Sequence, residues 1–302
     1  MFVHSLRCVL GRTVRLIVKS FVSLLVFLLI VISIDSWINP IPLNDTTIVH
    51  HDTQGGDDQR LIVFLTGIQS SGQQVSVDLV PLWQTFGDVD VVEYNRVNFD
   101  ARDVTRSVVK ASEGYSQLTL IGASLGGLLS YDIIAQLKYE QSPIKINLIL
   151  VDAPTGVEDI VNATAAKAVS KIPFGPLSNW LFTRTVWWFS FNPSDPSELE
   201  PVINTAALDA LHATAADWPL SSWRQQLSYI VEHAKLQADV LRDVSTVFLR
   251  SSMDTVVTKD AATHWPYVPR PLRVIDIRSM HIEFLGFPEA WREGFEMAFA
   301  YL

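Results

Sequence analysis

A serine between small residues, directly after an apolar run, is the strongest chemical signal in the sequence. The segment reads Leu120-Ile121-Gly122-Ala123-Ser124-Leu125-Gly126-Gly127. Glycines two positions before and two after the serine allow a strand to turn sharply into a helix, with the hydroxyl raised at the turn. The first N–H groups of that helix can bind a developing negative charge. The pattern is typical of a serine nucleophile. Its plainer alternative is a glycine-rich corner with an unused serine.

A serine hydroxyl is a weak nucleophile and needs a base, for which histidine is suited because its pKa lies near neutral pH. We expect that base to be His281, which follows the last predicted strand and precedes a terminal helix. A structural histidine is the alternative. The other histidines lie before the apolar N-terminal segment, in a polar linker, in a helical insertion or after a helical run: His4, His50, His51, His212, His233 and His264.

A carboxylate must orient the histidine, and Asp254 is the best-placed candidate. It lies in Met253-Asp254-Thr255-Val256, shortly after an apolar run, so we expect it in a loop at a strand end. Asp152 follows another apolar run and is the second candidate. Aspartate also favours turns and helix N-caps, which is the structural alternative for both residues.

Two N–H donors are needed to stabilise the oxyanion of a tetrahedral intermediate. The backbone N–H of Leu125, directly after the serine, is the first candidate. Ile68 is the second, because it follows Thr66-Gly67 in the loop after an apolar strand, and the glycine lets the backbone approach closely. The alternative is an ordinary turn.

Apolar runs alternate with helical stretches through most of the chain. The strands and helices that they form must position the four loops that carry Ile68, Ser124, Asp254 and His281. Continuous apolar strands separated by helices predict an α/β fold, with a mostly parallel sheet covered by helices on both faces. The carboxyl ends of such strands lie at one edge of the sheet. We predict strands over 60–65, 88–94, 118–121, 144–151, 245–250 and 272–277, with helices over 76–86, 103–113 and 125–139.

The stretch 155–243 has no convincing strand and predicts a helical cap between the two halves of the core, 60–154 and 244–302. We expect most of its aromatic side chains to form the cap's own core. Part of 185–191 should face the sheet edge or a membrane, because it is too apolar for full solvation. The tryptophans of the cap are Trp180, Trp187, Trp188, Trp218 and Trp223.

The N-terminal segment predicts a membrane anchor. Residues 20–34 carry no charge, and basic residues without any acid precede them. We therefore expect a cytoplasmic basic N-terminus over 1–19, a transmembrane signal anchor over 20–38 and a linker over 39–59 with room for a short strand. The catalytic domain then lies on the non-cytoplasmic side. The alternative is a signal peptide that is cleaved, leaving a secreted protein.

Composition narrows the classes of function. The formal net charge of −9 on 302 residues gives no reason to expect nucleic-acid binding. Cys8 is the only cysteine, so the domain after the apolar segment has no disulfide. No metal-ligand motif such as C-x-x-C or H-E-x-x-H occurs, and we expect neither a metal nor an organic cofactor. Composition does not indicate an oligomeric state.

Over residues 58–302 the chain resembles the α/β-hydrolase family. The resemblance rests on the elbow around Ser124, the acid loop with Asp254 and the late His281, in that order. It differs from the family at Thr66-Gly67, where His-Gly is usual, and in 94–100, which lacks the family's glycines.

The resemblance implies a serine hydrolase of esterase or lipase type that forms an acyl-enzyme. Its substrate would be a small-molecule or lipid ester, and the aromatic residues of the predicted cap suggest that the acyl group is apolar. Peptidase, thioesterase, acyltransferase and C–C hydrolase chemistry remain alternatives on the same fold. A non-catalytic binding module is an alternative of a different class.

Overall fold

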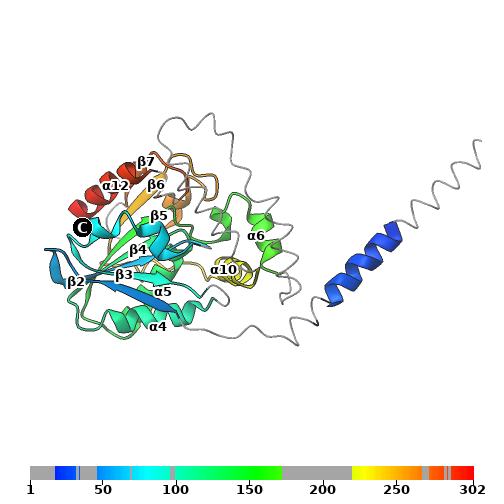
Figure 1. Cartoon of the computed structure of the whole chain (residues 1–302), viewed down its shortest axis with the longest axis horizontal. Helices are drawn as coiled ribbons and strands as arrows, with labels where there is room; N and C mark the ends of the chain where they lie inside the picture. The colour runs from blue at the N-terminus through cyan, green and yellow to red at the C-terminus, as the bar shows by residue number, and fades with distance from the viewer. Residues whose placement is uncertain are drawn as a thin grey trace, which may run out of the picture.

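A computed structural model describes residues 18–31, 34, 46–68, 70–95, 99–171, 220–266, 272–281, 284 and 287–302. In this part of the chain a sheet of seven strands in the order β1-β3-β2-β4-β5-β6-β7 forms the centre (Figure 1). The strands are β1 (Thr47–His51), β2 (Asp57–Leu65), β3 (Gly87–Glu93), β4 (Gln117–Ala123), β5 (Lys145–Val151), β6 (Ser245–Ser251) and β7 (Arg273–Ile277).

Strands β2 to β7 pair in parallel, as the apolar runs predict. The exception is β1, which pairs antiparallel with the edge of β3. It lies within 39–59, so that stretch is not only a linker: part of it extends the sheet. Its alternating exposed and half-buried side chains fit an edge strand with one solvated face.

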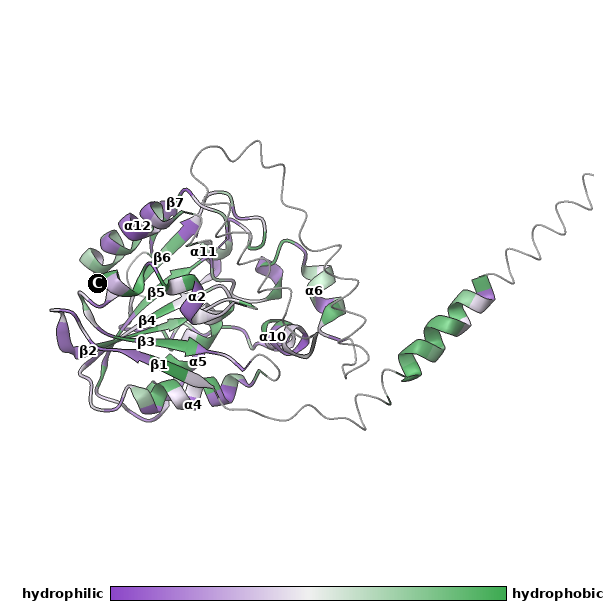
Figure 2. Cartoon of the chain, viewed as in Figure 1, coloured by the Kyte–Doolittle hydropathy of each residue, from purple (hydrophilic) through white to green (hydrophobic). Residues whose placement is uncertain are grey.

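Helices cover both faces of the sheet, which confirms this part of the expected fold. One core packs α4 (Ala101–Ala111) and α5 (Leu125–Tyr139) against Leu61, Val63 and Leu65. The other packs α3 (Val80–Trp83) and α12 (Pro288–Tyr301) against Ile62 and Phe64. Successive residues of β2 therefore enter opposite cores, and Figure 2 shows the central strands as largely apolar.

The single helix predicted over 76–86 is wrong in detail. The structure has two short helices, α2 (Gly72–Ser76) and α3 (Val80–Trp83), joined by a turn. Pro81 lies in the first turn of α3. Proline has no N–H to give to a preceding helical turn, so one continuous helix through this position is disfavoured.

The described part of the predicted cap is helical. It comprises the 3-10 turn η1 (Val157–Asp159), α6 (Ala163–Val169) and α10 (Leu220–Glu232), and α10 packs against α5 and α6. Trp223 on α10 contacts the core beside α4 and α5. The remaining four tryptophans named above lie outside the described residues, as does all of 185–191. Between β6 and β7 the chain forms the short helix α11 (Ala261–His264).

Residues 18–31 form a helix that Figure 2 shows as largely apolar. Its large side chains, such as those of Phe21 and Leu24, are exposed. Among the described residues we find no helix with the length and apolar character needed to cross a membrane. The transmembrane anchor predicted over 20–38 is therefore not supported by the structure. Residues 32–33 and 35–38 of that segment lie outside the described part.

Candidate active site

Ser124 occupies a sharp turn between β4 and α5. Its backbone has φ 50° and ψ −116°, a conformation that L-residues rarely adopt. The turn is fixed by hydrogen bonds from Ser124 N–H to the carbonyl of Val151 at 2.8 Å and from Gly127 N–H to the carbonyl of Ser124 at 2.9 Å. A Cβ atom at Gly126 would lie 2.0 Å from the carbonyl oxygen of Leu65, so no larger residue fits there without movement.

The strand ends bring the predicted catalytic side chains to one edge of the sheet. Ala123 pairs with Val151, Val151 with Leu249, and Ser251 with Ile277. Ser124, Asp152, Asp254 and His281 all follow these positions in the chain. The residues come from four different strands, and parallel pairing aligns the ends of those strands.

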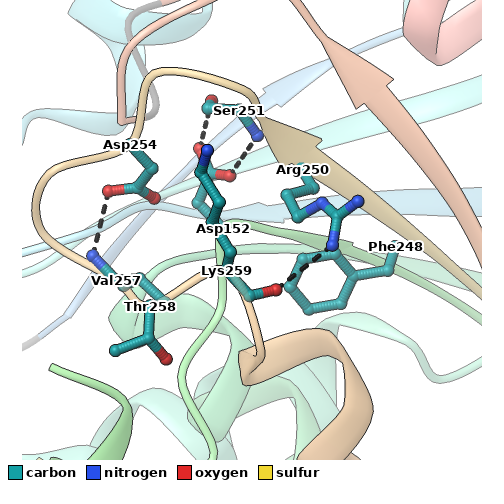
Figure 3. A pocket seen from close by; sticks show the side chains of 8 residues that line it. All are labelled: Asp152, Phe248, Arg250, Ser251, Asp254, Val257, Thr258 and Lys259. Carbon is teal, nitrogen blue, oxygen red and sulfur yellow. Dashed lines mark hydrogen bonds between the residues drawn. The ribbon is translucent and has the colours of Figure 1, made fainter.

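Asp254 and His281 form a direct hydrogen bond. Nδ1 of His281 lies 2.8 Å from Oδ2 of Asp254, and both side chains are largely buried. The other carboxylate oxygen, Oδ1, accepts hydrogen bonds from the N–H groups of Val256 at 2.7 Å and Val257 at 2.9 Å. Figure 3 shows the hydrogen bond from Val257. Because an ionised carboxylate only accepts, Nδ1 carries the proton and Nε2 of the neutral imidazole is left as the basic nitrogen.

A histidine–aspartate contact alone does not identify a catalytic base. Other described histidines also contact aspartates: His50 with Asp90, His233 with Asp132, and His264 with Asp159. His281 differs from them because its partner follows β6 and it follows β7, at the sheet edge where Ser124 turns out of β4.

Asp152, the second candidate acid, is a further member of the cluster. It is only 1% exposed, has φ 46° and lies directly after β5. Its Oδ1 accepts the N–H of Ser251 at 2.6 Å, and its Oδ2 lies 2.5 Å from the Ser251 hydroxyl (Figure 3). Burial raises the pKa of Asp152 above its usual value.

The loop after β2 lies beside the elbow. Leu65 pairs with Gly122, so Thr66-Gly67-Ile68 leaves the sheet next to Ser124. The hydroxyl of Tyr94, only 3% exposed, donates a hydrogen bond to the carbonyl of Thr66 at 2.8 Å. Burial raises the pKa of Tyr94 far above its usual value, so this phenol is a donor at any ordinary pH. Sequence reasoning missed this support, although Tyr94 ends a predicted strand adjacent to the loop.

Asp152, Asp254 and His281 are also the one group among the described residues that could hold a metal ion. Their ligating atoms all lie within 4.8 Å of one another. The same atoms take part in the hydrogen bonds described above, and a metal at His281 would have to replace the Nδ1 proton that Asp254 accepts. The donor set fits a hydrogen-bonded cluster of groups without calling for an ion.

Several solved structures have a similar fold over most of this chain. A hydrolase from Pseudomonas aeruginosa PA01 has 13% sequence identity and a TM-score of 0.60, with 84% of this chain and 94% of that chain covered. An esterase from Rhodococcus sp. ECU1013 has 19% identity and a TM-score of 0.59, covering 87% and 98%. An enol-lactonase from Burkholderia xenovorans LB400 has 13% identity and a TM-score of 0.62, covering 84% and 96%.

No protein-family model and no curated protein sequence matches the chain. The likeness to the solved structures therefore rests on the arrangement of the elements and not on sequence. It agrees with the mostly parallel sheet and the helices on both of its faces. The chain has the fold of the α/β hydrolases.

Proposed function

We propose that this protein is a serine hydrolase that cleaves carboxylic esters through an acyl-enzyme, with Ser124, His281 and Asp254 as its catalytic triad. The observation that carries the proposal is the 2.8 Å hydrogen bond from His281 Nδ1 to Asp254. It leaves Nε2 as a base at the sheet edge from which the strained Ser124 projects. Neither secondary structure nor core packing requires a strained serine and a histidine–aspartate pair at the same edge of the sheet.

The reaction follows from these groups. Ser124 Oγ attacks the acyl carbonyl while its proton passes to Nε2 of His281. The backbone N–H groups of Ile68 and Leu125 stabilise the oxyanion, each such donor being worth about 3–4 kcal/mol in comparable sites. Collapse expels the alcohol, which takes the proton from Nε2. Water then attacks the acyl group, His281 accepts its proton, and release of the acid returns that proton to Ser124.

Asp254 supports this cycle without exchanging a proton. Its two backbone hydrogen bonds hold the carboxylate while Oδ2 faces Nδ1. The carboxylate therefore orients the imidazole and stabilises the imidazolium in each half of the reaction.

Esters are the substrate class that the comparisons favour. The names of similar structures include esterases, an enol-lactonase and carboxylesterases, all of which act on acyl–oxygen bonds. The aromatic composition of the predicted cap favours an apolar acyl group. A panel of esters of increasing acyl length tests this part of the proposal. Equal turnover of short and long esters would argue against an apolar acyl site.

Labelling with a fluorophosphonate probe tests the nucleophile. We expect the full chain to be labelled and Ser124→Ala to be unlabelled, while the exposed-site control Ser116→Ala is labelled like the wild type. Folded wild-type protein that is neither labelled nor active on any ester would instead favour a non-catalytic binding module on the same fold. Labelling that persists in Ser124→Ala would place the nucleophile elsewhere.

We also propose that the N-terminal segment holds the chain at a membrane, with the hydrolase on the non-cytoplasmic side. Support comes from the apolar residues 18–31, where Phe21, Leu24 and Phe27 are each more than 60% exposed, and from the basic flank before them. The full chain should stay with membranes after an alkaline wash. The triple variant Phe21→Asp, Leu24→Asp, Phe27→Asp should be released, whereas Phe21→Leu with Phe27→Leu should remain. Release of the wild type in its uncleaved form would refute the anchor.

A further inference from the structure

We propose that Asp152 is held uncharged and is a positioning residue of the active site: its carboxyl proton is donated to Ser251, and Ser251 donates to the carbonyl of Met280, next to His281. The inference rests on the proposed function, because it concerns how the catalytic histidine is held. It assigns Asp152 a role different from that of the orienting carboxylate Asp254.

The Ser251 hydroxyl has one hydrogen but two oxygen neighbours at hydrogen-bond distance. The Ser251 oxygen lies 2.5 Å from Asp152 Oδ2 and 2.8 Å from the carbonyl oxygen of Met280. A hydroxyl has one hydrogen, and a carbonyl can only accept. If Asp152 were ionised, it too could only accept, so one of these short contacts would bring two lone-pair oxygens together. A proton on Asp152 Oδ2 turns both contacts into hydrogen bonds.

The surroundings of Asp152 favour the same protonation state. Asp254 and His281 both lie close to it, with ligating atoms within 4.8 Å. Both side chains are nearly buried, but Asp254 accepts two backbone N–H groups and faces His281, whereas the backbone donor to Asp152 is the N–H of Ser251. Burial raises the pKa of Asp152 and nearby Asp254 adds to that rise, while His281 and the hydrogen bonds from Ser251 oppose it. When two carboxyl groups lie this close together, the pair is expected to hold one proton, and the proton stays on the group whose charge has fewer hydrogen-bond donors.

The remaining charged groups near Asp152 lie around a cavity of about 10 Å³, which has room for roughly one water molecule. Arg250 and Lys259 line it together with Asp152 and Asp254 (Figure 3). The Arg250 guanidinium donates to Asp276 at 2.7 Å. Lys259 is exposed to solvent. The cavity is too small for an organic ligand.

The network ends on the backbone that carries the catalytic histidine. Met280 directly precedes His281, and its carbonyl also lies 3.0 Å from the hydroxyl of Ser279. Ser279 in turn accepts the indole N–H of Trp291 on α12. The loop after β7 is thus tied to β5 and β6 on one side and to α12 on the other. Displacing the Met280 carbonyl would move His281 relative to Ser124.

Asp152→Asn is the decisive variant. Asparagine can accept from the Ser251 N–H and donate its amide N–H to the Ser251 oxygen, so it reproduces a neutral Asp152. We expect kcat/KM of Asp152→Asn within about threefold of the wild type, with the acid limb of its pH profile unmoved. An ionised Asp152 would favour the protonated imidazole. Its replacement would then shift the acid limb by about one pH unit to lower pH, which would overturn the proposal.

Ser251→Ala removes the hydroxyl that links Asp152 to the Met280 carbonyl, while Asp254 and His281 themselves are not substituted. We expect kcat to fall about tenfold with KM nearly unchanged, because a misplaced base impairs chemistry more than binding. Unchanged kcat in the folded Ser251→Ala protein would contradict a positioning role.

Infrared spectroscopy provides a readout that does not depend on activity. At neutral pH the full chain should show the carbonyl stretch of a protonated carboxylic acid, Asp152→Asn should lose it, and the exposed-site control Asp58→Asn should keep it. Absence of that band from the wild type would overturn the inference even if Ser124 is labelled by the fluorophosphonate. Presence of the band with no labelling would leave Asp152 neutral and refute the hydrolase proposal instead.

Discussion

Asp254→Asn should nearly abolish turnover while leaving the fold intact, because the surrounding backbone dictates how the new amide must point. In the wild type, Oδ1 accepts from the N–H groups of Val256 and Val257 at 2.7 and 2.9 Å. The carbonyl oxygen of an asparagine must take that place, since the NH₂ group cannot accept. The NH₂ group then faces Nδ1 of His281 where Oδ2 stood.

This orientation forces the imidazole into its other tautomer. A donor opposite Nδ1 requires Nδ1 to become the acceptor, which puts the remaining proton on Nε2. His281 can then no longer take the proton of Ser124. The same substitution in a chymotrypsin-like triad lowers kcat by about 10⁴. A loss of that size corresponds to about 5.4 kcal/mol of transition-state stabilisation.

The assay is kcat on a short-chain chromogenic ester, together with the rate of fluorophosphonate labelling. The thermal unfolding midpoint shows whether the variant has kept its fold. Asp260→Asn is the matched control, because Asp260 is exposed and its side chain caps no N–H group. A folded Asp254→Asn protein whose kcat stays within tenfold of the wild type would refute the assignment of Asp254 as the orienting acid.

Four further perturbations follow from the structure. Gly126→Ala places a Cβ 2.0 Å from a backbone oxygen, so the urea midpoint should drop by the equivalent of about 1–3 kcal/mol; unchanged stability would contradict the tight elbow. Tyr94→Phe leaves the Thr66 carbonyl without its donor and should cost about 1–3 kcal/mol with a larger effect on kcat than on KM; full activity would show that the oxyanion loop needs no such support. A chelator should leave esterase activity intact, and activity that is lost and then restored by Zn²⁺ would assign the acidic cluster to a metal. For His233, burial lowers the pKa, but the hydrogen bond to Asp132, the charge of Asp132 and the carbonyl of Ala234 together outweigh it, so the folded-state pKa is raised above 6.5. This contribution to stability is full below pH 6.5 and lost as the pH rises through the folded-state pKa, so His233→Asn should flatten the rise in wild-type urea sensitivity above pH 6.5; identical pH profiles would disprove a stabilising contact between His233 and Asp132.

The sequence by itself determined the features that depend on residues close together along the chain. Continuous apolar runs predict buried strands, and six of them appear in the sheet close to the expected positions. The small residues around Ser124 predict the turn, because the steric clashes that this turn must avoid involve only a short segment and the adjacent strand. The antiparallel β1 was less evident, since an edge strand has one solvated face and a weak apolar signal.

The membrane segment shows a limit of sequence reasoning. Hydropathy and the basic flank favour a transmembrane anchor, yet the helix seen over 18–31 does not reach the required length within the described residues. Its exposed apolar side chains keep a membrane location as a proposal to be tested. The expectation that part of 185–191 faces the sheet edge or a membrane also stays a prediction, because these residues lie outside the described part of the chain.

Only the tertiary structure shows which of the two candidate acids lies against Nδ1 of His281. Asp152 and Asp254 both follow apolar strands, and their sequence contexts do not rank their distances to His281. Packing places the Asp254 carboxylate against Nδ1 and directs Asp152 toward Ser251. The protonation state of each then depends on burial and on hydrogen-bond donors that come from distant parts of the chain. Such contacts arise when separate strands align their ends, so no local pattern of residues encodes them.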